Sequence, residues 1–147
     1  MNIKKAFVDA NVIIDILDKS RENFVVANQI INYCIDKGIE LYTSCDLITT
    51  VYYVLSKKDR KKALEDIKAT LDIFELISFS NTEVNEAIYL MEKDKNFRDL
   101  EDTLQYVLAK KEDCDLILTN DKRFYSPDIR TFSSMQFFNK INNEEVE

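Results

Sequence analysis

Short apolar runs alternate with longer stretches of helical spacing along most of the chain. The short runs predict β-strands at Lys5–Val8, Glu40–Thr43, Glu75–Phe79, Asp115–Thr119 and, as the weakest pattern, Ile129–Phe132. Apolar residues recur at spacings of three and four, which predicts helices, over Phe24–Lys37, Asp46–Lys57, Arg60–Phe74, Glu83–Lys93 and Leu100–Glu112. This alternation favours an α/β fold, a three-layer α/β/α sandwich whose central, mainly parallel sheet has four or five strands.

The chain length and the absence of linkers predict a single domain. The chain has 147 residues, and no repeat or low-complexity tract interrupts residues 1–139. Residues 140–147 are polar, so we expect a flexible tail there. No apolar run approaches the roughly 20 residues of a membrane span, and no secretion signal is recognisable at the start. The three cysteines form no CxxC pair, so we expect reduced thiols in a cytoplasmic protein.

Two residue types that many enzymes require are scarce or absent. The chain has no histidine, which excludes Ser-His-Asp and Cys-His catalysis as well as zinc–histidine sites. Its one glycine, Gly38, excludes the Walker phosphate loop, the GxGxxG dinucleotide motif and the GxSxG nucleophile elbow. Catalysis would therefore depend on carboxylates, hydroxyls, lysines, thiols or a metal, and 27 Asp and Glu residues make carboxylates the leading candidates.

Topology predicts that four aspartates lie on one edge of the sheet. Asp9 directly follows the first strand and Asp121 follows the fourth, while Asp99 and Asp102 begin the helix that leads into that fourth strand. In a parallel α/β unit such helices begin at the carboxyl edge of the sheet, where ligands also bind. Like charges this close favour a divalent cation between them, and carboxylates suit Mg²⁺ or Mn²⁺.

Each acid taken alone has a simpler interpretation. Aspartate is a favoured helix N-cap, and acids in a first turn complement the helix dipole, so Asp99 and Asp121 could serve only as caps. Asp102 differs because it shares a helical stripe with Tyr106 on a helix that is apolar on its other side as well. We therefore expect Asp102 not to point simply into water.

Three segments in register resemble the PIN domain family, the nuclease module of VapC-type toxins. FVDANVIIDIL (Phe7–Leu17) resembles its opening strand and helix, DLEDTLQYVLA (Asp99–Ala109) its acidic third segment, and LILTNDKRF (Leu116–Phe124) its closing segment. TSCDLITTVYYVLSKK (Thr43–Lys58) resembles the second segment, and the resemblance spans about residues 5–139. The D-x-E-D sequence and VYYVL point to a subgroup associated with toxin–antitoxin pairs.

The resemblance implies metal-dependent hydrolysis of phosphodiester bonds in single-stranded RNA. The metal-binding and catalytic residues would be Asp9, Asp99, Asp102 and Asp121, with Mg²⁺ or Mn²⁺ as cofactor. Polar support would come from Asn11, Ser44, Thr119 and Asn120. RNA, single-stranded or structured, would contact the basic residues Lys57, Lys58, Lys122 and Arg123. The family also implies a cognate antitoxin protein as partner and a homodimer.

Two positions depart from the family pattern. The second acid of the family falls at Thr50, which leaves the site one carboxylate short unless Asp99 or Glu101 substitutes, and the position before Phe124 holds Arg123 where an acid is common. Thr50 and the net charge of −7 keep open a catalytically weak module that binds RNA or a protein. A nuclease acting on structured DNA would share the site, but the chain has no added domain to grip a duplex.

Overall fold

A computed structural model describes residues 2–146 and shows strands and helices in alternation. The strands are β1 (Lys5–Val8), β2 (Glu40–Ser44), β3 (Phe74–Ile77), β4 (Leu116–Leu118) and β5 (Arg130–Phe132). The helices are α1 (Ala10–Leu17), α2 (Phe24–Asp36), α3 (Leu47–Ser56), α4 (Arg60–Ile73), α5 (Asn81–Lys93), α6 (Leu100–Lys111) and α7 (Ser134–Val146). None of the described helices is long and apolar enough to cross a membrane.

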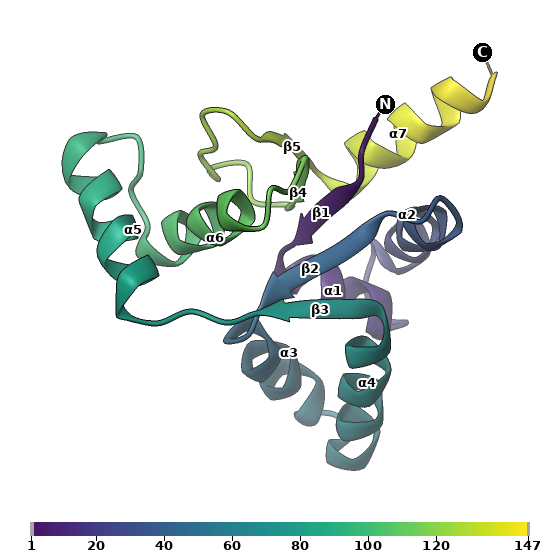
Figure 1. Cartoon of the computed structure of the whole chain (residues 1–147). Coiled ribbons are helices and arrows are strands. Elements are labelled where there is room, and N and C mark those ends of the chain that lie inside the picture. Colours follow the sequence, from purple (N-terminus) through teal and green to yellow (C-terminus); the bar gives the residue numbers. More distant parts are fainter. Residues whose placement is uncertain (1, 147) are drawn as a thin grey trace.

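The strands form one five-stranded parallel sheet in the order β3-β2-β1-β4-β5 (Figure 1). Strand β1 is central, and its Phe7 lies opposite Tyr42 of β2 and Ile117 of β4. Because all strands run the same way, their carboxyl ends lie along one edge. The segments that follow β1, β2 and β4 therefore meet at that edge, which confirms the predicted architecture.

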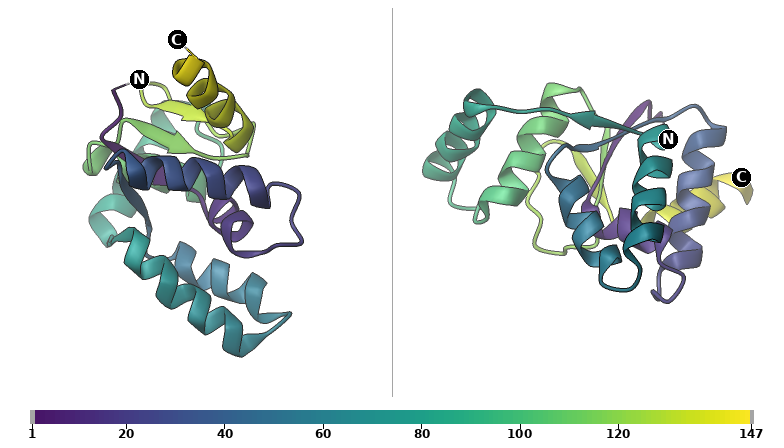
Figure 2. Two further views of the ribbon diagram at one scale, coloured as in Figure 1. Left: turned by 90° about the vertical axis from the view of Figure 1, so that its right-hand side faces the viewer. Right: turned by 90° about the horizontal axis from the view of Figure 1, so that it is seen from below.

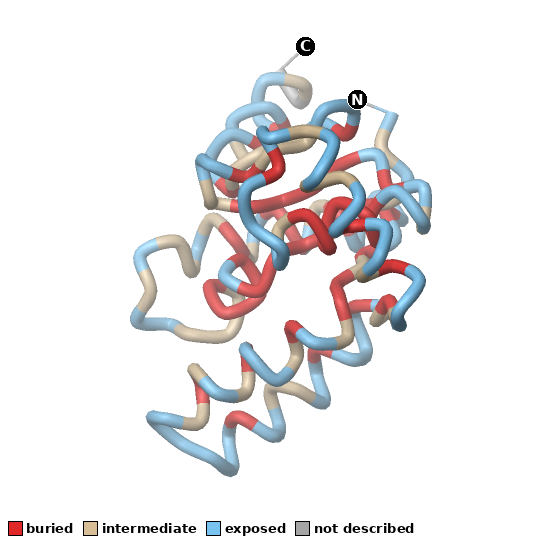
Figure 3. Tube along the Cα trace, turned by 90° about the vertical axis from the view of Figure 1, so that its left-hand side faces the viewer, coloured by how far each residue is buried: buried red, intermediate tan, exposed pale blue. Residues whose placement is uncertain are grey.

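Helices cover both faces of the sheet, as expected for a three-layer sandwich. Figures 1 and 2 show α5 and α6 on one side and α1, α2 and α7 on the other, while α3 and α4 form a pair that projects from the body. The innermost strand residues are wholly buried, as Figure 3 shows for the middle of the molecule. Continuous apolar runs such as LIL in β4 are typical of parallel strands covered on both faces.

The start of α5 was predicted from the sequence to within two residues. Ser80 and Glu83 form the predicted capping box of α5, and the Glu83 carboxylate accepts a hydrogen bond from the Ser80 amide over 3.3 Å. The helix itself begins at Asn81, two residues before the predicted start. All three cysteines are free thiols, as expected.

The C-terminal segment differs from the expectation of a loose polar tail. Residues 140–146 continue helix α7, and residue 147 lies outside the described residues. Phe137 and Ile141 are one turn apart on α7 and both are buried, with the Phe137 ring edge-to-face with Tyr33 of α2 at 6.1 Å. These two apolar contacts were too sparse among polar neighbours to predict a helix from the sequence pattern.

Candidate active site

Asp9 lies where β1 passes into α1. Its Oδ1 caps the helix by accepting a hydrogen bond from the Ala10 amide at 2.7 Å, and the residue is only 7% exposed. Burial is the main cause that raises the pKa of the Asp9 carboxyl, and hydrogen bonds from Thr119 and Ala10 partly oppose it. A carboxylate in this position is costly to ionise unless a cation is close to it.

Thr119 joins Asp9 to the loop that carries Asp121. The buried Thr119 hydroxyl donates to Asp9 Oδ2 at 3.1 Å, and its oxygen accepts from the Asp121 amide, also at 3.1 Å. The Asp121 carboxylate in turn accepts from the Arg123 amide at 2.9 Å, which closes a turn after β4. Thr119 was expected as polar support, and it holds the ends of β1 and β4 together.

The first turn of α6 supplies the acids of the D-x-E-D segment. Asp99 is the N-cap of α6: its Oδ1 accepts from the Asp102 amide at 2.9 Å, and its side chain is exposed. Its backbone carbonyl also accepts from the Thr103 hydroxyl at 2.7 Å. The cap interpretation of Asp99 is therefore confirmed, while its role as a metal ligand stays a prediction.

Asp102 has the most perturbed acidity at this edge. Burial and the nearby charges of Asp99, Asp121, Asp9 and Glu101, in that order, raise its pKa to about 7. A carboxyl with a pKa raised this far, among four other acids, is a candidate for binding a cation. Asp9, Asp102 and Asp121 are thus electrostatically coupled, as their predicted placement on one edge requires.

Asp46 was missing from the predicted site, and Glu101 was expected only as a substitute for the carboxylate absent at Thr50. Burial raises the pKa of Glu101, and the charges of Asp9, Asp46 and Asp99 raise it further. Asp46 follows β2 by two residues and occupies the N-cap position of α3 without a side-chain cap hydrogen bond, and the Ser44 hydroxyl donates to its Oδ1. Thr50 lies one turn further along α3 and is exposed. Glu101 and Asp46 are therefore the candidates for the carboxylate that Thr50 does not supply.

Gln105 is a second residue that the sequence did not reveal. It lies one turn after Glu101 on α6 and is only 2% exposed. Its amide nitrogen lies 3.5 Å from Glu101 Oε1, and a side-chain hydrogen bond from Gln105 helps to lower the pKa of Asp9. Its oxygen has no hydrogen-bond partner among the described residues, which is unusual for a buried amide.

The donor set at this edge fits a hard divalent cation. All the candidate ligands are carboxylate oxygens, the ligands that Mg²⁺ and Mn²⁺ prefer, and the pKa values of Asp9, Glu101 and Asp102 are raised mainly by burial and further by the charges of neighbouring acids. Within residues 2–146, no three such side chains are already gathered in a ligating arrangement. Binding would therefore draw Asp9 and Asp102 toward a shared ion.

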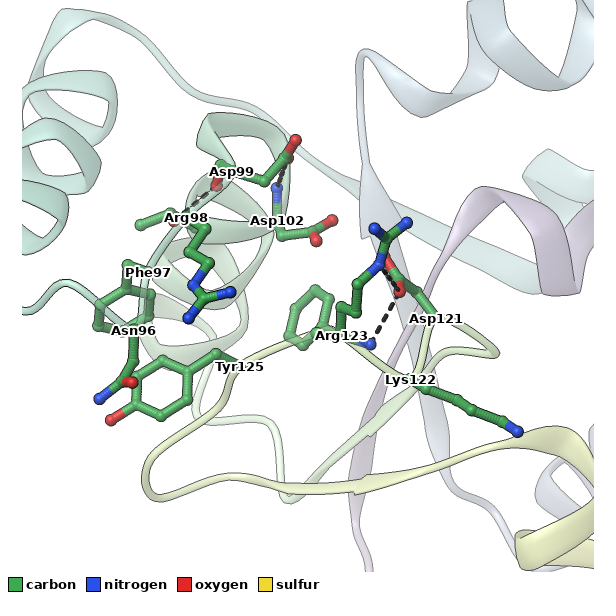
Figure 4. Close-up of a pocket in the computed structure, with 11 residues that line it drawn as sticks. Asn96, Phe97, Arg98, Asp99, Asp102, Asp121, Lys122, Arg123 and Tyr125 are labelled. Atoms are coloured by element: carbon green, nitrogen blue, oxygen red, sulfur yellow. Dashed lines mark hydrogen bonds and ion pairs between the residues drawn. The ribbon is translucent and has the colours of Figure 1, made fainter.

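A cavity of about 580 Å³ opens beside these acids. Its lining comes from residues 96–99, the first turn of α6 and residues 121–125. Figure 4 shows the Asp102 carboxylate pointing toward the space shared with Asp121 and Arg123, whereas Lys122 extends away from the acids. Arg123 lies 3.9 Å from Asp121 and is 96% exposed, so this ion pair is weak.

Asn11 and Asn120 line a separate cavity, together with Asp15 and Arg21. Asp15 is buried and pairs with Arg21 at 2.6 Å, and the Asn120 amide lies 3.4 Å from its other oxygen. Asn120 also accepts from the Ser134 amide at 2.9 Å, so its visible contacts join α1 to the start of α7.

Two of the four predicted RNA-contacting residues, Lys57 and Lys58, lie away from the acidic cavity. Lys57 and Lys58 follow α3, at the turn that leads into α4. Lys58 already pairs with Asp18 at 3.1 Å, and the Lys57 ammonium lies over the Tyr53 ring at 4.5 Å. Lys122 and Arg123, in contrast, line the cavity itself.

Comparison with known proteins identifies the family and the fold. The PIN domain family model matches residues 6–129, most of the chain. The chain belongs to the PIN domain family. This PIN domain is also 58% identical over 142 residues to Ribonuclease VapC1 of Aquifex aeolicus (strain VF5), covering 97% of this chain and 99% of that protein.

Solved structures share the fold at low sequence identity. Mycobacterium tuberculosis VapC20, a toxin that cleaves the sarcin–ricin loop, aligns with a TM-score of 0.61 and 12% identity over 76% of this chain and 86% of that chain. VapBC2 of Rickettsia felis, solved with a promoter DNA fragment, aligns with a TM-score of 0.64 and 18% identity over 88% and 98% of the two chains. The match to the family model includes Asp9, Asp102 and Asp121, so the acids lie in the shared part of the fold.

Proposed function

We propose that this protein is a Mg²⁺- or Mn²⁺-dependent endoribonuclease that hydrolyses phosphodiester bonds of single-stranded RNA. The proposal depends on one observation: the charges of Asp9 and Asp121 help to raise the pKa of Asp102. These three acids follow β1, lie in the first turn of α6 and lie in the loop after β4. The identity of 58% to a ribonuclease over nearly the whole chain supports the same activity. Metal dependence and the preference for single strands rest on the donor set and on the family resemblance.

The residues of the site would have different roles. Asp9 and Asp102 would hold the ion directly, because they are the buried and the most perturbed of the acids. Asp99 and Asp121 would complete the shell or orient the attacking water, and Glu101 could supply the carboxylate that is absent at Thr50. When bound, the ion neutralises the carboxylates, stabilises charge on the phosphate and lowers the pKa of water. Thr119 keeps Asp9 and the Asp121 loop in register through its two hydrogen bonds.

We also propose that the protein is the toxin of a type II toxin–antitoxin pair in the cytoplasm. The similarity to a VapC ribonuclease and to the VapBC2 assembly supports a cognate antitoxin as partner. A basic side chain of that partner inserted among the acids would neutralise the same charges that favour a cation. A homodimer remains a proposal that rests on the family resemblance.

The test is cleavage of a labelled single-stranded RNA by the wild type and by Asp9→Asn, with Mg²⁺, with Mn²⁺ and with EDTA. We expect cleavage only by the wild type with a divalent ion, and a fall of at least about 100-fold in Asp9→Asn, since a lost ligand removes charge stabilisation worth several kcal/mol. The exposed Asp72→Asn, on α4, serves as the matched control and should cleave like the wild type. Equal rates for wild type and Asp9→Asn would refute the catalytic assignment.

A second candidate, a catalytically weak module that binds RNA or a protein, is favoured by Thr50 at the position of the second acid. Calorimetry with Mn²⁺ separates the two hypotheses. The nuclease predicts one or more sites that Asp102→Asn removes, whereas the binding module predicts no heat that depends on Asp102.

A further inference from the structure

The cavity beside the acids is lined by acidic, basic and aromatic side chains. Figure 4 shows Asp102 and Asp121 on opposite sides of it, with Arg98 and Tyr125 on the side of Asp102 and Arg123 beside Asp121. In a chain of net charge −7, an arginine that lines this cavity points to an anionic ligand. Within the part of the chain that the structure describes, Arg98 forms no ion pair, although Asp99 is its neighbour in sequence. Its guanidinium is therefore available to a ligand in the cavity.

The aromatic rings of Phe97 and Tyr125, which line the cavity, are held in place by contacts with each other and with neighbouring residues. Phe97 and Tyr125 meet edge-to-face at 4.7 Å, and Phe97 stacks on Tyr106 at 5.3 Å. The Tyr125 hydroxyl donates to Asp94 at 3.0 Å, which fixes the ring from its far end. Phe97 and Phe124 are buried, whereas Tyr125 is half-buried and lines the cavity, so its ring offers a surface to a ligand. A preorganised aromatic surface loses little entropy when it binds a flat group.

We propose that this cavity binds one nucleotide of the RNA next to the scissile phosphodiester bond. Arg98 would pair with the phosphate of that nucleotide, and its base would pack against Tyr125. The volume of about 580 Å³ lies within the range of small-molecule pockets, roughly 300–1,000 Å³, and a nucleotide is a ligand of that size. Since a base paired in a duplex cannot enter a side cavity, this geometry would favour single strands. The inference rests on the proposed function for the position of the scissile bond.

Arg98 is tested by RNA binding under conditions that prevent cleavage. Fluorescence anisotropy measures the Kd of a labelled uridine or adenosine tetranucleotide for the full chain in EDTA at low salt. We expect Arg98→Ala to raise the Kd by about tenfold or more, because a charge-assisted hydrogen bond to phosphate is lost. Arg60→Ala, an exposed arginine at the start of α4, should change the Kd less than about twofold. The slope of log Kd against log salt should fall by about 0.7 in Arg98→Ala alone.

Tyr125 is tested by a pair of substitutions that separate the ring from the hydroxyl. Tyr125→Leu removes the stacking surface and should weaken binding by about 5- to 150-fold, the range that corresponds to loss of one base–aromatic contact. Tyr125→Phe keeps the ring and should bind within about threefold of the wild type. Neither variant should change the salt slope, because no phosphate contact is lost. Thermal melting of each variant shows whether it is folded.

The outcomes distinguish this inference from the proposed function. Titration with Mn²⁺ should give the same affinity for Arg98→Ala and wild type, since Arg98 is not a ligand. If Arg98→Ala loses RNA binding while the wild type itself binds no Mn²⁺, the proposed catalysis would be refuted and the nucleotide site supported. Equal effects of Arg98→Ala and Arg60→Ala, or duplex RNA bound as tightly as single strands, would overturn the inference. So would an Arg98→Ala variant that binds RNA normally but loses its antitoxin.

Discussion

The hydroxyl of Thr119 donates a hydrogen bond to Asp9 Oδ2 and accepts one from the Asp121 amide, both at 3.1 Å. One buried side chain therefore couples the carboxyl ends of β1 and β4, the two central strands that carry acids. Asp9 and Asp121 are far apart in the sequence, and Thr119 fixes where they stand relative to each other. Removal of this hydroxyl should affect both the stability of the fold and the binding of a cation.

Thr119→Val keeps the shape of the side chain and removes both hydrogen bonds. We expect the free energy of unfolding to fall by about 1–3 kcal/mol, because a buried carboxylate loses a donor. The pKa of Asp9 should rise further, since the Thr119 hydrogen bond lowers it, and Mn²⁺ affinity near neutral pH should fall. Urea unfolding and calorimetry measure the two effects. Thr119→Ser should restore both, and a Val variant that binds Mn²⁺ like the wild type would contradict this role.

Asp102 should make stability depend on pH in the absence of divalent ions. Its pKa is about 7 in the folded protein and near its ordinary value of 3.8 in the unfolded chain. Between about pH 4 and 7 the folded state keeps a proton that the unfolded state has lost, so the free energy of unfolding falls as pH rises through that window. Asp102→Asn should flatten this dependence and raise Tm at pH 8. A Tm that is unchanged by the substitution at pH 8 would contradict the raised pKa.

The two roles of Asp99 can be separated by two substitutions. Asparagine is also a good N-cap, so Asp99→Asn should keep stability while it removes the charge. Asp99→Ala loses the hydrogen bond to the Asp102 amide and should cost about 1 kcal/mol of stability. If Glu101 is the acid that compensates for Thr50, Glu101→Gln should weaken Mn²⁺ binding more than Asp99→Asn does. The reverse order in calorimetry would assign the compensation to Asp99.

Gln105 combines burial with an unsatisfied oxygen, an arrangement that costs stability. Gln105→Met keeps the volume and removes a buried polar group, so we expect unfolding free energy within about 1 kcal/mol of the wild type, or slightly higher. The contacts with Asp9 and Glu101 would be lost, and Mn²⁺ affinity should fall about tenfold. A large loss of stability with unchanged affinity would show that Gln105 serves only the core.

The sequence predicted the sheet edge that carries the acids because topology alone places it there. Asp9 and Asp121 directly follow strands, and α6 begins at the same edge, so the alternation of elements was sufficient. The same criterion applied to β2 would have revealed Asp46, two residues after that strand.

Other features depend on tertiary contacts that no local pattern contains. Gln105 lies on a helix covered on several sides, and the sequence does not show which of its polar side chains points inward. Helix α7 has few apolar positions, and its burial of Phe137 and Ile141 becomes visible only when it packs beside α2. The cavity with Arg98 arises from two segments, before α6 and after β4, that are distant in sequence.

Binding of a divalent ion by the acids at the carboxyl edge of the sheet can be tested by anomalous diffraction from a crystal soaked in Mn²⁺. We expect an anomalous peak within about 2.0–2.4 Å of carboxylate oxygens of Asp9 and Asp102, and no peak there in Asp102→Asn. A fully occupied peak elsewhere on the protein, with none between Asp9 and Asp102, would contradict it.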